Sequence, residues 1–395
     1  MRITIVTTKL DFNGGGGKFD ILLTAQALLE KGYEVRVVTA FSESNNISEE
    51  VAFEVCPEQV SSKRLMSMQI FIVSVLKKYA ASTDVFYLIG GAFLPGAGWY
   101  RRFSVKSKPV VVHLNGYTDF IEDYFKRAPL WPDKYLTFRQ GWLRGAKHRL
   151  RIFLERLIGV YFINKLDAIT VYSEGTANYY LRAGLAKNKT SVLLSFHDIL
   201  SLINQPLKNN PFSDCPKDSF HILSVSRFYI DKGADLLIDA FGQAKLPNAI
   251  LHLVGDGPQE EELKKIVGER DLSSSVKFYP WQKPDDLAAF YQHADLFVYP
   301  ARLPEAMVRT SVEAMALGVP LVVPDTSAQS WVGEVAKIFK NGDVADLKDK
   351  LEQAYGDKEF REKAHLIGPK LALDYDYRRL VIQLENILLK YHKNK

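Results

Sequence analysis

Two glutamates in one short segment carry the strongest signal for chemistry in this chain. Glu305 and Glu313 follow Asp295–Tyr299, an apolar run that predicts a buried strand. The segment from Ala306 to Leu317 contains good helix formers, so we expect Glu305 in a loop and Glu313 inside a helix. Ligands of parallel sheets bind beyond the carboxyl ends of the strands, where the first N–H groups of a helix can hold a phosphate. The pattern therefore indicates a site for a phosphorylated ligand.

The beginning of the chain has the pattern of a βαβ unit around a glycine-rich turn. Residues 2–7 and 33–39 predict strands, residues 21–30 predict a helix, and Asp11–Gly17 reads DFNGGGG. Four consecutive glycines let the backbone approach a phosphate closely. A nicotinamide dinucleotide is disfavoured, because the G-x-G-x-x-G spacing is not cleanly present and no acidic residue ends the second strand. A flexible turn is the alternative for these glycines.

Three more candidate residues lie at the ends of predicted strands. His113 lies at the carboxyl end of the strand predicted over residues 109–114, while Arg227 and Lys232 follow the strand predicted over residues 221–226. For His113, a hydrogen-bonded structural histidine is the alternative to a role in a site.

The strand, the two glutamates and the helix resemble the E-x7-E signature of the retaining glycosyltransferases of family 4, which have the GT-B fold. The run from Arg227 to Gly233 resembles the R-x4-K-G loop of that family. The resemblance covers nearly the whole chain and is strongest from Ser224 to Pro320. It implies an α/β protein with two Rossmann-like domains that face each other across a cleft.

The resemblance also divides the chain. Residues 1–198 would form the acceptor-side domain, and residues 199–375 would form the domain that binds the nucleotide sugar. Residues 376–395 would form a helix that packs back on the first domain. Within this scheme, the proline-containing run Gln205–Asp218 predicts the linker between the domains.

Each candidate residue acquires a role through the resemblance. Arg227 and Lys232 would bind the donor diphosphate, and Glu313 would bind the nucleotide ribose. Glu305 would bind the donor sugar and, with His113, would be a catalytic residue. Gly15, Gly16 and Gly17 would line the junction between donor and acceptor. Met307, Val308 and Arg309 complete the expected substrate-binding residues. We expect no metal and no cofactor, because no D-x-D motif lies in a plausible place and the two cations can do the work of a metal ion.

Two segments depart from the family pattern. Ser195–Asp198 stands where the family usually has Asn-Gly-x-Asp, and Asp325–Gln329 stands where it usually has a Gly-Gly pair. The first departure removes the asparagine whose role would be inherited. The second either reshapes the acceptor side or is only a different turn.

Composition fits a soluble two-domain protein. The chain has 395 residues, of which 47% are hydrophobic and 25% are charged. Cys56 and Cys215 have no metal or redox spacing, so we expect free thiols in a reducing, cytoplasmic compartment. Met1–Thr8 predicts a first strand, not a signal peptide, and no apolar run approaches the length of a membrane span.

The segment Lys126–Lys165 is strongly basic. It contains ten lysines and arginines, two acidic residues and seven interleaved aromatic residues. Basic and aromatic residues together suit an anionic membrane surface, which would make the protein peripheral at the inner face of the membrane. A nucleic-acid partner is less favoured, because no recognised binding motif is present. A long helix with a solvated basic face is the remaining alternative.

The expected activity is transfer of a glycosyl group from a nucleotide-diphosphate sugar to an acceptor hydroxyl, with retention of anomeric configuration. A basic segment beside a membrane would suit a glycan or lipid-linked acceptor, as in polysaccharide biosynthesis. The enzymatic alternative is a sugar-nucleotide epimerase of similar fold. The non-catalytic alternative is a membrane-associated scaffold that has lost some elements of the transferase pattern.

Overall fold

The structure is a computed structural model of the whole chain. It describes residues 1–10, 16–45, 51–61, 65–114, 158–303, 305, 307–326 and 332–392. Within these ranges the chain forms two compact units. Unit 1 contains the residues up to His197 together with those from Tyr375 onward, and unit 2 contains Asp198–Asp374.

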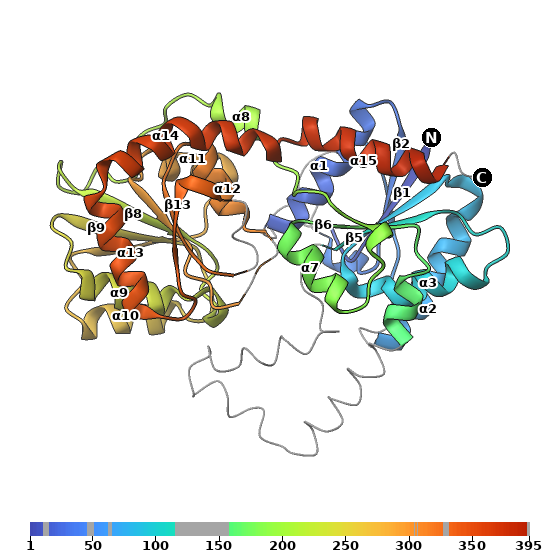
Figure 1. Ribbon diagram of the computed structural model, residues 1–395, viewed down its shortest axis with the longest axis horizontal. Coiled ribbons are helices and arrows are strands. Elements are labelled where there is room, and N and C mark those ends of the chain that lie inside the picture. Colours follow the sequence, from blue (N-terminus) through green and yellow to red (C-terminus); the bar gives the residue numbers. More distant parts are fainter. Residues whose placement is uncertain are drawn as a thin grey trace, which may run out of the picture. The chain divides into compact units, whose positions relative to one another are not determined.

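Unit 1 is built on a parallel sheet with strand order β3-β2-β1-β4-β5-β6-β7 (Figure 1). This is the doubly wound Rossmann order, extended by one strand, with its switch point between β1 and β4. The strands are β1 (Arg2–Thr7), β2 (Glu34–Thr39), β3 (Glu54–Pro57), β4 (Val85–Ile89), β5 (Val110–Leu114), β6 (Ala168–Val171) and β7 (Thr190–Val192). The main helices are α1 (Gly16–Glu30), α2 (Leu65–Tyr79), α3 (Leu94–Phe103), α7 (Glu174–Arg182) and α15 (Tyr377–His392).

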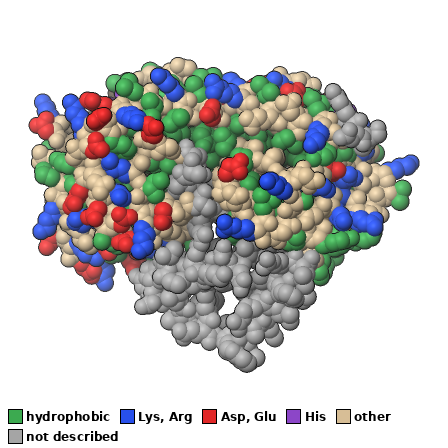
Figure 2. Space-filling view, viewed as in Figure 1, with side chains coloured by type: hydrophobic (Ala, Val, Ile, Leu, Met, Phe, Trp, Pro, Cys, Tyr) green, Lys and Arg blue, Asp and Glu red, His purple; other side chains and the backbone are tan. Residues whose placement is uncertain are grey.

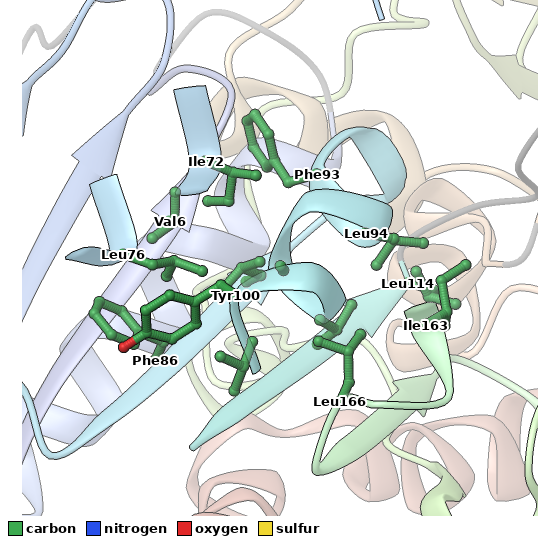
Figure 3. Packing of buried hydrophobic residues seen from close by; sticks show 14 of the residues in the cluster. Val6, Ile72, Leu76, Phe86, Phe93, Leu94, Tyr100, Leu114, Ile163 and Leu166 are labelled. Atoms are coloured by element: carbon green, nitrogen blue, oxygen red, sulfur yellow. The ribbon is translucent and has the colours of Figure 1, made fainter. Parts of the chain in front are cut away.

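Successive side chains of each strand enter opposite faces of this sheet, so unit 1 has two apolar layers. One layer packs α1 and α15 against residues such as Ile5 and Tyr87. The other packs α2, α3 and the segment 158–166 against residues such as Val6 and Phe86 (Figure 3). Because α15 lies beside α1, the late part of the chain completes the core of the unit that the early part begins.

Unit 2 repeats the same arrangement with six strands, in the order β10-β9-β8-β11-β12-β13. All of its strand pairs are parallel, and its switch point lies between β8 and β11. The strands are β8 (Phe220–Val225), β9 (Ala249–Val254), β10 (Val276–Tyr279), β11 (Leu296–Val298), β12 (Leu321–Pro324) and β13 (Ala336–Phe339). The helices are α8 (Ile199–Ile203), α9 (Ala234–Ala244), α10 (Glu260–Glu269), α11 (Pro284–Gln292), α12 (Arg309–Ala316), α13 (Val344–Gly356) and α14 (Lys358–Ala372). The expected pair of Rossmann-like domains is therefore confirmed.

Two sequence-based expectations about local structure were wrong. The helix expected from Ala306 begins only at Arg309, because Val308 has an extended backbone with φ −116° and ψ 102°. The run Gln205–Asp218, expected to link the domains, lies within unit 2. Phe212 anchors it there: its buried ring stacks on that of His252 with centroids 3.8 Å apart. A single buried aromatic residue therefore holds this polar, proline-containing run against unit 2.

Neither Cys56 nor Cys215 forms a disulfide. Among the helices that the structure describes, none is both long enough and apolar enough to span a bilayer.

Candidate functional site

The charged candidates of unit 2 lie at the switch point of its sheet. Arg227 and Lys232 lie in the loop that follows β8, and Glu305 lies in the loop that follows β11. Strands β8 and β11 are paired directly, so both loops begin at the same edge. This edge is where open α/β sheets bind ligands.

A cluster of three polar side chains joins the two loops. The Lys232 ammonium contacts Glu305 Oε1, and the Tyr299 hydroxyl donates to the same oxygen at 2.6 Å. Lys232 Nζ also lies 3.3 Å from the Tyr299 hydroxyl oxygen and 3.8 Å from the Asp231 carboxylate. Burial and the neighbouring carboxylate raise the pKa of Tyr299 well above its ordinary value, so its hydroxyl stays protonated and acts as a donor. The ligand-free cluster thus holds Lys232 against a carboxylate.

Gly233 lets the two loops approach closely. It has φ +72°, and a Cβ built at this position would lie 2.2 Å from the carbonyl oxygen of Pro300. Any side chain would push the β8 loop away from the β11 loop. The Lys-Gly pair therefore has a structural reason: the glycine provides the contact that brings the lysine to Glu305.

Arg302 fixes the same two loops from the buried side. Its guanidinium donates to both carboxylate oxygens of Asp235, at 2.6 and 2.7 Å, and to the carbonyl of Ile230 at 2.8 Å. Asp235 lies in the first turn of α9, just after Lys232 and Gly233. Sequence reasoning overlooked Arg302 and Tyr299, although both lie inside the segment it singled out. A long cation beside the loop was the available signal for Arg302.

A second glycine-containing turn supports Arg227. In Gly255-Asp256-Gly257, a Cβ at Gly255 would lie 1.9 Å from the carbonyl oxygen of Ser226, and one at Gly257 would lie 2.5 Å from that of Phe228. The backbone around Arg227 therefore rests directly on this turn. The guanidinium itself is exposed, 5.6 Å from the centroid of the Tyr229 ring.

Glu313 lies in α12, as expected, and only 17% of its side chain is exposed. The Tyr291 hydroxyl donates to its Oε2 at 3.1 Å, and Arg309 lies 3.7 Å from its Oε1. Burial raises the pKa of Glu313, while Arg309 and the hydroxyl lower it. No side chain caps the start of α12, where Val308 precedes Arg309, so its first N–H groups remain available to a ligand. Met307 lies just before them, in the same loop as Glu305.

His113 occupies a different environment, in unit 1. It is buried on β5, where its Nδ1 lies 2.8 Å from Thr170 Oγ1. The Thr170 hydroxyl itself donates to the carbonyl of Val112 at 3.3 Å, so Nδ1 carries the proton and donates to Thr170. Nε2 is then an acceptor, and it has no hydrogen-bond partner among the described residues. Burial lowers the pKa of His113 to about 3, so the ring is neutral.

Asp20 is a polar anchor in unit 1 that the sequence did not reveal. It lies on α1, and its buried carboxylate accepts hydrogen bonds from the Tyr172 hydroxyl and the Phe196 N–H. The Tyr172 ring lies 4.4 Å from that of His113, centroid to centroid. Phe196, which stands where the family pattern has glycine, is buried in the core. The departure at Ser195–Asp198 thus has a packing role.

Several expected features lie partly or wholly outside the described residues. Gly15 is outside, while Gly16 and Gly17 form the first residues of α1. The basic segment Lys126–Lys165 is described only from residue 158. Asp325 is described, and its carboxylate accepts from the Asn341 N–H at 2.8 Å, but Ser327–Gln329 are outside.

Within the described ranges, one group of side chains has ligand atoms close enough for a metal ion. Candidate atoms of Cys215, His221 and His252 lie within 4.8 Å of one another. However, His221 Nδ1 and His252 Nε2 share a hydrogen bond of 3.0 Å, and His252 Nδ1 lies 3.2 Å from the Tyr279 hydroxyl. Both nitrogens of His252 are therefore already satisfied by neighbouring side chains.

Two family models match this chain, one in each half. The model described as Glycosyltransferase Family 4 matches residues 14–198. The model described as Glycosyl transferases group 1 matches residues 208–370, a range that contains Arg227, Lys232, Glu305 and Glu313.

Curated relatives match mainly over part of the chain. A sulfoquinovosyl transferase of Arabidopsis thaliana is 29% identical over 42% of this chain and 32% of its own length. A lipopolysaccharide core biosynthesis glycosyltransferase of Rhizobium meliloti is 31% identical over 38% of this chain and 44% of its own length. The chain thus spans less than half the length of each of these relatives. Among solved structures, Anabaena HepE in complex with UDP and glucose matches 99% of this chain and 100% of its own, with a TM-score of 0.71 and 19% identity.

Proposed function

We propose that this chain is a glycosyltransferase of GT-B fold that moves a glycosyl group from a nucleotide-diphosphate sugar to an acceptor hydroxyl. Glycosyltransferase family models that match residues 14–198 and 208–370 support the proposal. The proposal rests on the cluster of Lys232, Glu305 and Tyr299 at the switch point of unit 2. A cation and an uncapped helix start on adjoining segments suit a diphosphate.

The chemistry assigned to Lys232 follows from charge. Breaking the glycosidic bond leaves negative charge on the departing nucleoside diphosphate, and positioned cations stabilise that charge. Without the donor, the Lys232 ammonium is paired with Glu305. Donor binding would exchange this carboxylate for a phosphate, which would free Glu305 to accept hydrogen bonds from sugar hydroxyls. Arg227, which is exposed on the same loop, would complete the diphosphate site.

The two remaining candidates receive roles that match their environments. Glu313, largely buried between Tyr291 and Arg309, would hold the nucleotide ribose. His113 would contact the donor sugar through Nε2, which accepts a hydrogen bond from a hydroxyl because Nδ1 already donates to Thr170. A neutral imidazole suits an uncharged sugar. Retention of configuration is proposed from the resemblance of the E-x7-E segment to retaining enzymes.

The acceptor that we propose is a glycan or lipid-linked precursor in polysaccharide or lipopolysaccharide synthesis. The relative from Rhizobium meliloti, named for lipopolysaccharide core biosynthesis, supports this class of acceptor. Such acceptors are presented at a membrane, so we place the enzyme in the cytoplasm, peripheral to the membrane. We also propose that the transfer needs no metal ion.

Product analysis tests the proposal. Purified protein is incubated with a panel of labelled nucleotide sugars, with and without a lipid extract that contains acceptors. The products are then separated by chromatography. Transfer requires a labelled acceptor product and release of the nucleoside diphosphate; the anomeric configuration of the product is then read by NMR. Conversion of the donor to an isomeric nucleotide sugar would establish the epimerase instead. Binding of donors with no product from any acceptor would favour the scaffold.

A further inference from the structure

Exposed apolar side chains gather on one side of unit 1. Among the described residues, fifteen large apolar side chains are exposed, and seven of them lie between residues 66 and 105 or between residues 158 and 161. Six of these form what we call the apolar patch: Met66, Ile70, Trp99, Phe103, Ile158 and Tyr161, which are between 39% and 70% exposed. The grouping separates them from isolated surface residues, which need no explanation.

The three segments that carry the patch are packed against one another. The rings of Trp99 and Phe103 on α3 lie 5.5 Å apart, and Phe103 lies 6.3 Å from Phe162, which in turn lies 5.2 Å from Tyr161. Gly98 sets this contact, because a Cβ there would lie 1.9 Å from the carbonyl oxygen of Phe162.

Helix α2 extends the patch. Met66, Ile70 and Lys77 are four and seven residues apart, so they share one face of the helix, and the Lys77 ammonium lies 5.6 Å from the Trp99 ring. The opposite faces of α2 and α3 are buried, as Ile72, Leu76, Leu94 and Tyr100 show in Figure 3. The exposed side chains are therefore held by a rigid core.

Cations accompany the exposed rings. Besides Lys77 on Trp99, Arg102 lies 5.2 Å from the ring of Phe103, and Lys165 lies 4.6 Å from that of Tyr161. Figure 2 shows basic and hydrophobic side chains together at the edge of unit 1 where Figure 1 labels α2 and α3. None of these three cations forms an ion pair within the described part of the chain.

Carboxylates on these segments are few and already paired. Residues 65–114 and 158–167 contain only Asp84 and Asp167 as acidic residues. Asp84 is bonded to Arg2 and Asp167 to Arg101, so neither neutralises the three cations of the patch. The surface is thus apolar and aromatic at its centre and positively charged at its rim.

We propose that the apolar patch docks on an anionic membrane surface. Rings of tryptophan and tyrosine suit the headgroup level of a bilayer, and lysine and arginine beside them attract anionic lipids. This inference rests on the proposed function. It adds the surface that would bring unit 1 to a lipid-linked acceptor. It is independent of the basic residues 126–157.

Vesicle sedimentation tests the docking. The whole protein is mixed with vesicles of phosphatidylglycerol and phosphatidylcholine, or of phosphatidylcholine alone, at low and high salt. We expect binding to the anionic vesicles only, with release as salt screens the charges. A triple variant, Lys77→Glu, Arg102→Glu and Lys165→Glu, should bind at least about a hundredfold more weakly, since each basic residue near an anionic membrane contributes roughly fivefold.

Matched variants on other faces of unit 1 provide the control. Lys390→Glu changes an exposed lysine and Ile382→Ser changes an exposed apolar residue, both on α15, which packs on the opposite face of the sheet from α2 and α3. Both should bind vesicles like the wild type, whereas Trp99→Ser with Phe103→Ser should weaken binding to the anionic vesicles at low salt. Melting temperatures show whether each variant is folded. The salt dependence of wild-type binding tests the proposal even if a variant does not fold.

Several outcomes would overturn the docking proposal. These are no binding at low salt, equal binding to neutral vesicles, and a triple variant that binds like the wild type. Concentration-dependent dimerisation that the patch variants abolish would assign the surface to a second copy of the chain. Transfer to a water-soluble acceptor separates this proposal from the enzymatic one: patch variants should retain it, while Lys232→Ala should lose it and still bind vesicles.

Discussion

The two units share one strand order but equip the ends of their strands differently. In unit 2, the loops after β8 and β11 bring a lysine, a glutamate and a tyrosine into mutual contact. In unit 1, β5 ends in a buried, neutral histidine whose neighbours are a threonine and a tyrosine. One edge carries a partly exposed ion pair, while the other carries a buried, neutral imidazole.

In both units the sheet topology determines where a site can form, and the side chains of the loops determine which ligand it can bind. Both sheets have a switch point, yet only the described loops of unit 2 combine cations with an uncapped helix start for a diphosphate. The neutral imidazole of His113 suits the hydroxyls of a sugar. Variants that remove the charges from the site in unit 2, or the neutral imidazole from unit 1, test this difference.

Removing the cation of unit 2 should have the largest effect. Lys232→Ala deletes a charge-assisted contact to the diphosphate, worth about 1.5–3 kcal/mol, so kcat/KM should fall by about 10- to 150-fold. Arg227→Ala should act in the same direction. The matched control is Lys217→Ala, at an exposed lysine of unit 2. Steady-state kinetics measure the effect, and near-normal values in both variants would remove these cations from the site.

Neutralising the carboxylate should separate turnover from nucleotide binding. Glu305→Gln replaces a charged acceptor with a neutral amide, which weakens the hydrogen bonds to the sugar hydroxyls, so kcat should fall by about tenfold or more. The same change releases Lys232 from its ion pair, so the affinity for the nucleoside diphosphate, measured by calorimetry, should be unchanged or higher. Tyr299→Phe, which leaves the carboxylate charged, is the comparison variant. Loss of nucleotide binding in Glu305→Gln would mean that the glutamate holds the nucleotide instead.

The neutral edge of unit 1 should appear in the pH dependence of stability. The pKa of His113 is about 3 in the folded chain and near 6.5 in an unfolded one, so below pH 6.5 the unfolded state binds more protons. The free energy of unfolding should therefore decrease as the pH is lowered. This group contributes a loss of about 2 kcal/mol between pH 6.5 and pH 5. Urea unfolding of His113→Asn should lack that component, whereas a change at the exposed His365 should preserve it.

The smallest effect is expected at Glu313. Glu313→Gln keeps the shape of the side chain but removes its charge, so nucleoside diphosphate affinity should fall by about 0.5–1.5 kcal/mol, or roughly two- to tenfold. Tyr291→Phe, which deletes only the hydroxyl that supports Glu313, should have a smaller effect in the same direction. If the nucleotide protects the Glu313→Gln variant from melting as well as it protects the wild type, the ribose assignment is wrong.

Sequence patterns predicted the sheets well because their strands are nearly continuous apolar runs. Val85–Ile89 was located without error, since every residue of β4 is buried and β-branched or otherwise bulky. The positions of Lys232 and Glu305 were also predictable, because each follows a strand within a few residues.

Contacts between distant segments could not be predicted. Arg302 bonds to Asp235, 67 positions earlier, and Asp20 bonds to Phe196, 176 positions later. Nothing in the local pattern around either residue indicates its partner. The late start of α12 was likewise hidden, because good helix formers gave no signal for the extended Val308.

The packing of α15 in unit 1 has a consequence for how the chain folds while it is being synthesised. Unit 2 is inserted into unit 1, whose core needs Leu380, Leu384 and Leu388 from α15. A growing chain can therefore finish unit 2 while unit 1 still exposes the apolar groove beside α1 that α15 will fill. Domains usually fold as units during synthesis, the earlier one first. Here residues 377–392 are synthesised after unit 2, so we expect unit 1 to complete its core only after unit 2 has been made.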